Sequence, residues 1–104
     1  MRIGLNLEDY PQVIAQTERE ILELNCDREQ IESQINLILI SINSKIAADT
    51  TLENEQQRKS KREELTHENE KLSQYKVSLA RTQIKIESKK IELNQLRNEF
   101  TVLK

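Results

Sequence analysis

Aliphatic residues recur every three to four positions in two long segments of the chain. In the first segment the pattern runs from Ile14 to Ile42, and in the second it runs from Leu65 to Leu103. This spacing is typical of helices that pair through one apolar face. The sequence therefore predicts an all-α fold in which the two segments form an antiparallel coiled-coil helical hairpin.

The boundaries of the two helices follow from the polar residues between the segments. We expect a first helix over about residues 10–48, a polar tip over about residues 49–60 and a second helix over about residues 51–103, within a single domain of residues 1–104. The stretch "ENEQQRKSKREE" contains no apolar residue, so it cannot lie in a helix seam. Thr50 followed by Glu53 matches a capping box and predicts a turn near Asp49, whereas the symmetry of the seam centres the turn near Glu55.

The antiparallel register places the two ends of the chain together. Tyr10 would lie opposite Phe100, Ile38 opposite Leu72, and Arg28 opposite Thr82 as a polar layer. Charge supports this pairing, because residues 1–55 hold 4 Lys/Arg and 11 Asp/Glu while residues 56–104 hold 12 and 7. An acidic helix would then lie beside a basic one, although exposed ion pairs contribute little individually.

The stretch "INLILISI" contains six aliphatic residues in eight, too many for one helix face. In the heptad register Ile35, Ile38 and Ile42 face the seam, and the other three aliphatic residues point outward. The second helix carries a similar outer stripe. The predicted oligomer or partner interface therefore comprises Leu37, Leu39, Ile40, Val77, Ile84 and Ile91.

Two kinds of assembly would bury these outer residues, and a third interpretation concerns residues 35–42 alone. The first is a homodimer of hairpins that forms a four-helix bundle. The second is a groove or helix of another protein. The third treats residues 35–42 as a β-strand, since Ile favours strands, but the heptad pattern runs through this stretch without a break.

A cluster of cations lies in the polar tip, at Arg58, Lys59, Lys61 and Arg62. Such a cluster can contact phosphates and bind nucleic acid by releasing counterions. The flanking glutamates reduce its field, and no aromatic residue lies between the cations for base stacking. The competing interpretation is a solvated end of the hairpin.

The sequence contains little that suggests catalysis. His67 is the only histidine and Cys26 the only cysteine, and neither has a partner at metal-ligand or nucleophile spacing. We therefore expect no enzymatic activity, no cofactor and no metal. The single cysteine favours a reducing compartment, "MRIGLNLEDYP" lacks the apolar core of a secretory signal, and no apolar run reaches the length of a membrane helix. These features predict a cytoplasmic protein that does not enter a membrane.

Two functions fit these observations. The first is a protein–protein interaction module, a self-assembling hairpin that acts as a scaffold, an adaptor or an inhibitor of a larger machine. The second is a small nucleic-acid-associated protein that contacts phosphates through the basic tip.

Overall fold

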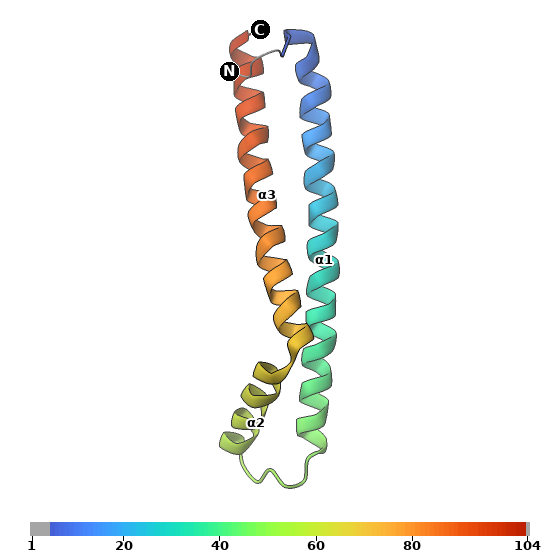
Figure 1. The fold of residues 1–104 in the computed structure, drawn as a ribbon, viewed down its shortest axis with the longest axis vertical. Helices are drawn as coiled ribbons and strands as arrows, with labels where there is room; N and C mark the ends of the chain where they lie inside the picture. The colour runs from blue at the N-terminus through green and yellow to red at the C-terminus, as the bar shows by residue number, and fades with distance from the viewer. Residues whose placement is uncertain (1–4, 104) are drawn as a thin grey trace. The chain divides into compact units, whose positions relative to one another are not determined.

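The computed structural model describes residues 5–103, and these residues are almost entirely helical. A 3-10 helix η1 (Leu7–Asp9) precedes three α-helices, which are α1 (Tyr10–Ala48), α2 (Glu55–Glu68) and α3 (Glu70–Leu103) (Figure 1). No strand occurs in residues 5–103, so the all-α prediction is confirmed, and the strand considered for residues 35–42 is wrong because that stretch lies inside α1. Residues 1–4 and 104 of the predicted domain lie outside the described residues.

The start of α1 agrees with the prediction. Asn6 has an extended backbone, and its N–H donates a hydrogen bond of 3.0 Å to Oδ2 of Asp9. Pro11 occupies the first turn of α1, where a backbone N–H has no partner within the helix. The polar cap therefore begins η1, which leads directly into α1, and the proline lies where α1 tolerates it.

The chain forms two compact units. The first unit comprises Met1–Arg28 and Arg81–Lys104, and the second comprises Glu29–Ala80. α1 and α3 each contribute a segment to both units.

In the first unit, the beginning of α1 packs antiparallel to the end of α3. The ring of Tyr10 stacks on the ring of Phe100 with 5.8 Å between the centroids, and Glu20 forms an ion pair with Lys89. The Tyr10–Phe100 contact is the one that the register predicts. Side chains at helical spacing on both helices are buried in this unit. They are Tyr10 and Thr17 on α1, and Ile86, Leu93 and Leu96 on α3.

The core of the second unit is aliphatic. Ile42, Ile46 and Leu72 are buried there, and partly buried neighbours pack against them: Ile35, Ile38, Leu39, Leu52 and Leu65. The predicted neighbours Ile38 and Leu72 therefore share one cluster. Beyond Ile42, where the predicted heptad series ends, Ile46 is buried and Lys45 is exposed. Burying Ile46 removes apolar surface from water, whereas burying the ammonium group of Lys45 would cost free energy.

The second predicted helix is not continuous, because it breaks at Asn69. This residue has φ −80° and ψ 102°, and its N–H donates to the carbonyl of Thr66 at 3.4 Å. Its Oδ1 accepts from the N–H of Leu72 at 2.8 Å, so one asparagine ends α2 and caps α3. Figure 1 shows that α2 and the beginning of α3 meet at a bend. Asparagine competes with the helical backbone for hydrogen bonds, which the periodicity of apolar residues does not report.

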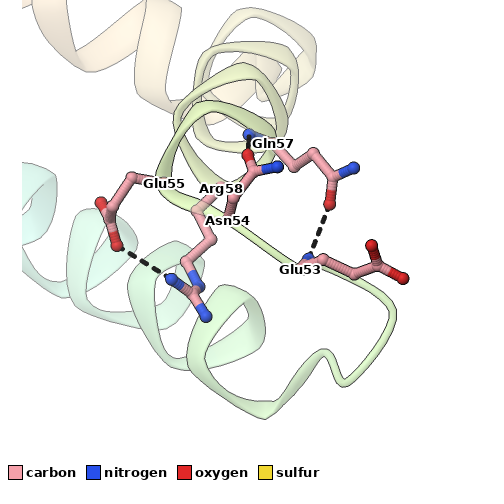
Figure 2. Close-up of polar contacts among 5 residues, drawn as sticks. All are labelled: Glu53, Asn54, Glu55, Gln57 and Arg58. Atoms are coloured by element: carbon pink, nitrogen blue, oxygen red, sulfur yellow. Dashed lines mark hydrogen bonds and ion pairs between the residues drawn. The ribbon is translucent and has the colours of Figure 1, made fainter.

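The capping box predicted at Thr50 and Glu53 is also wrong. The N-cap of α2 is Asn54, whose Oδ1 accepts from the N–H of Gln57 at 2.9 Å, and Oε1 of Gln57 accepts from the N–H of Glu53 at 2.6 Å (Figure 2). The preceding loop is closed by Asp49, whose carboxylate accepts hydrogen bonds from Thr51. The tripeptide Glu-Asn-Glu occurs at both helix starts, at residues 53–55 and 68–70. This local repeat is the signal that predicts both caps.

Candidate interaction surfaces

Two aliphatic residues of α1 lie on its outer face in the second unit. Leu37 is 59% exposed and Ile40 is 60% exposed, whereas Ile42 of the same helix is only 4% exposed. Residues at i and i+3 of a helix share a face, so Leu37 and Ile40 are neighbours, and helical geometry points both away from the core side. Water therefore covers two large aliphatic side chains at the centre of the "INLILISI" stretch.

The outer face of α3 carries a second aliphatic stripe. Val77 is 51% exposed in the second unit, and Ile84 and Ile91 are 69% and 60% exposed in the first unit. Their seven-residue spacing places them on one side of the helix. In the first unit, Ile84 and Ile91 lie opposite the buried residues Ile86 and Leu93.

One predicted interface residue lies elsewhere. Leu39 is partly buried and packs against the cluster of Ile42, Ile46 and Leu72, so it belongs to the core of the second unit. It lies 100° from Ile38 around the helix axis, close enough to extend the core face of α1. Leu22 was not among the predicted interface residues, and it is 64% exposed in the first unit at a position four residues before Cys26.

One stretch of α1 in the second unit is uncharged, and the exposed charged residues Glu29, Glu32 and Lys45 of the same unit lie on either side of it. The sequence has no Asp, Glu, Lys or Arg from Ser33 to Ser44, although one-third of all residues are charged. The exposed residues around Leu37 and Ile40 are uncharged, and they are Ser33, Gln34, Asn36, Ser41, Asn43 and Ser44. One cation lies beside them, because Arg62 of α2 donates a hydrogen bond to Asn43. An apolar centre with few charges is the composition that distinguishes the middle of a protein interface from other surfaces.

The charges of the first unit pair across α1 and α3. Nζ of Lys89 lies 2.7 Å from Oε2 of Glu20, and a nitrogen of Arg97 lies 3.0 Å from Oε1 of Glu18. The hydrogen bond from Lys89, followed by one from Gln16, lowers the pKa of Glu20, and the same bond with Glu20 raises the pKa of Lys89. These ion pairs join acidic residues of α1 to basic residues of α3 within one chain.

Three of the four cations in the basic cluster contact other residues of the chain. Arg58 lies 3.0 Å from Glu55 (Figure 2), and Lys61 lies 3.6 Å from Glu64. Nε of Arg62 donates to Oδ1 of Asn43 at 2.9 Å, and Lys59 is exposed. All four lie near the beginning of α2 in the second unit. The neighbouring carboxylates reduce the positive field that this cluster presents to a phosphate.

Side chains with catalytic or metal-binding chemistry are sparse. His67 and Cys26 are both exposed, and they lie in different units. Within residues 5–103, no group of three His, Cys, Asp or Glu side chains could hold a metal ion. A search of the same residues for a helix with the length and apolarity of a membrane span finds none.

Comparison of the sequence with family models, with curated proteins and with solved structures finds no match.

Proposed function

We propose that this chain is a non-enzymatic protein–protein interaction module that assembles with itself. Its two helical segments would form an antiparallel coiled-coil hairpin, and two hairpins would bury their outer stripes in a four-helix assembly. The assembled hairpins would act as a scaffold, an adaptor or an inhibitor of a larger machine. The single cysteine favours a reducing compartment, so we place this activity in the cytoplasm.

The observation that carries this proposal is the exposure of aliphatic side chains at helical spacing. Ile84 and Ile91 on α3, and Leu37 and Ile40 on α1, are each about 60% exposed or more. A scattered exposed leucine is ordinary, but aligned aliphatic residues on one helix face mark a surface that another molecule covers. Removing such side chains from water contributes about 25 cal/mol per Å² of apolar area.

Contacts within the units support the hairpin. In the first unit Tyr10 pairs with Phe100 and Glu20 with Lys89, so the segments of α1 and α3 run in opposite directions there. In the second unit Ile38 and Leu72 share one cluster. Both sets of contacts agree with the single register that the heptads predict for an antiparallel hairpin.

The alternative, phosphate contact through Arg58, Lys59, Lys61 and Arg62, has less support. Glu55 and Glu64 each pair with one of these cations. A nucleic-acid protein should lose affinity for a DNA duplex steeply with salt, and should lose it further when Arg58→Ala is combined with Lys61→Ala. The interaction module should keep its assembly state in the same double variant.

Light scattering during size-exclusion chromatography tests the proposal with two matched variants. The first places glutamate on both outer faces, at Leu37, Ile40, Ile84 and Ile91. The control places glutamate at four exposed polar positions away from the stripes, at Gln12, Gln56, Ser78 and Gln83. We expect a monomer for the first and the oligomer of the unmodified chain for the control. Equal masses for the unmodified chain and both variants would contradict the proposal.

A further inference from the structure

We infer that the contact between copies runs through α1, with the Ser33–Ser44 segments of two chains packed antiparallel about a two-fold axis between Leu37 and Ile40. This inference rests on the proposed self-assembly and names the surface and the geometry that would produce it. The Ser33–Ser44 face of one copy would therefore be covered by the same face of a second copy.

The first argument is the symmetry of the face. Ser33, Leu37, Ile40 and Ser44 are spaced by four, three and four residues, so they form one line along the helix. When the line is reversed, Leu37 lies opposite Ile40 of the second copy and Ser33 lies opposite its Ser44. A two-fold interface requires a self-complementary surface of this kind. If residue i of one copy contacts residue j of the other, then residue j of the first copy contacts residue i of the other.

The second argument is the size of the side chains. The two large aliphatic residues lie at the centre of the line, and serines lie at both ends. Small residues at the ends allow the two helices to approach closely, which gives the central leucine and isoleucine their full contact.

The third argument is electrostatic. Two copies of most surfaces of this chain would bring like charges together, because one-third of its residues are charged. The segment from Ser33 to Ser44 carries no charge, so its pairing with itself causes no such repulsion. Around Ile84, by contrast, the exposed side chains of Arg81, Lys85 and Glu87 are charged, so a pairing of two α3 faces would have to remove these charges from water.

Oxidative cross-linking tests this geometry directly. Two chains are prepared in a Cys26→Ser background, one with Ser33→Cys and one with Ser44→Cys; all three positions are exposed. Antiparallel pairing places residue 33 opposite residue 44 of the second copy, whereas two copies of residue 33 would lie about 16 Å apart along the axis. A disulfide needs Cα atoms within about 7 Å. We therefore expect cross-linked dimers only when the two chains are mixed.

Each other outcome overturns the inference. Cross-linking of the Ser33→Cys chain with itself would mean parallel pairing. The absence of any cross-link in a chain that is dimeric by light scattering would mean that another surface is used. A chain that remains monomeric by light scattering would contradict the proposed self-assembly itself. Failure of the α1 geometry and failure of self-assembly therefore give different results.

A second measurement does not depend on cysteine chemistry. Leu37→Glu combined with Ile40→Glu should raise the dissociation constant of the dimer about 100-fold or more, because both copies lose their central contacts. Gln12→Glu combined with Gln83→Glu is the matched control at exposed polar positions and should leave the constant within about threefold. Equal constants for the two variants would contradict the inference. Circular dichroism of both variants verifies that the helices remain folded.

Discussion

The hydroxyl of Tyr10 donates a hydrogen bond of 3.0 Å to Oε2 of Glu99, which joins the first residue of α1 to the end of α3. Tyr10 is fully buried, and its ring also stacks on Phe100. Burial of a tyrosine ring stabilises the fold, and a buried hydroxyl without a hydrogen-bond partner would offset part of that stabilisation. Glu99 supplies that partner, so a single residue closes this end of the first unit through both apolar and polar contacts.

Substitutions at Tyr10 should separate these two contributions. Tyr10→Phe keeps the stacked ring and should lower the free energy of unfolding by about 0.5–1.5 kcal/mol. Tyr10→Ala also leaves a cavity and should lower it by about 3–5 kcal/mol. Urea unfolding followed by circular dichroism measures both values. Equal losses for the two variants would mean that the ring contributes nothing beyond its hydroxyl.

The bend at Asn69 should depend on its side chain. Asn69→Ala removes the cap of α3 and should lower the free energy of unfolding by about 0.5–2 kcal/mol, whereas Asn69→Asp should remain close to the unmodified chain because aspartate caps equally well. The same urea titration compares the three chains. If the alanine variant were the most stable, α2 and α3 would prefer to form one straight helix.

The Glu20–Lys89 pair should make stability depend on pH. The hydrogen bond from Lys89 lowers the pKa of Glu20 from its ordinary 4.5, so the folded chain binds this proton less readily than the unfolded chain. The stabilisation is therefore complete above pH 4.5 and is lost as the pH falls through the lowered pKa. Lys89, whose pKa is raised from 10.5, loses its contribution as the pH rises through that raised value.

Glu20→Gln provides the measurement for this pair. The urea midpoint of this variant should lie below that of the unmodified chain near neutral pH, and the two midpoints should converge in acid. High salt should also bring them together, because the pair is partly exposed and is screened. A difference that persists unchanged into acid would exclude the ion pair as its source.

Adjacent residues of α1 should respond differently to truncation. Leu39 packs against the core of the second unit, so Leu39→Ala should lower the free energy of unfolding by about 1–3 kcal/mol. Ile40 is 60% exposed, so Ile40→Ala should change it by less than about 0.5 kcal/mol in dilute solution, where few dimers form. If Ile40→Ala lowered the free energy of unfolding as much as Leu39→Ala, Ile40 would have to be buried within a single chain.

The contacts within each unit could be predicted from sequence because burial of aliphatic residues at helical spacing is a strong, repeated signal. It placed Ile38 near Leu72 and Tyr10 beside Phe100. The break at Asn69 could not be predicted in this way, because one side-chain hydrogen bond decides it. Leu39 was misplaced for a related reason, since a strict heptad is narrower than the core face of α1 in the second unit.

The exposed stripes were predictable for the residues that repeat with the heptad. Val77, Ile84 and Ile91 recur every seven residues and are exposed as predicted. Leu22 was missed because it stands apart from that repeat and forms a face only with Cys26, one turn further along.

Sedimentation equilibrium of the unmodified chain, from about micromolar to about millimolar concentration, tests self-assembly most directly, because this range covers dissociation constants of typical weak and moderate dimers. We predict that the average mass rises with concentration from that of one chain to that of two. A mass of one chain throughout the range would contradict self-assembly, and Leu37, Ile40, Ile84 and Ile91 would then have to be covered by a different protein.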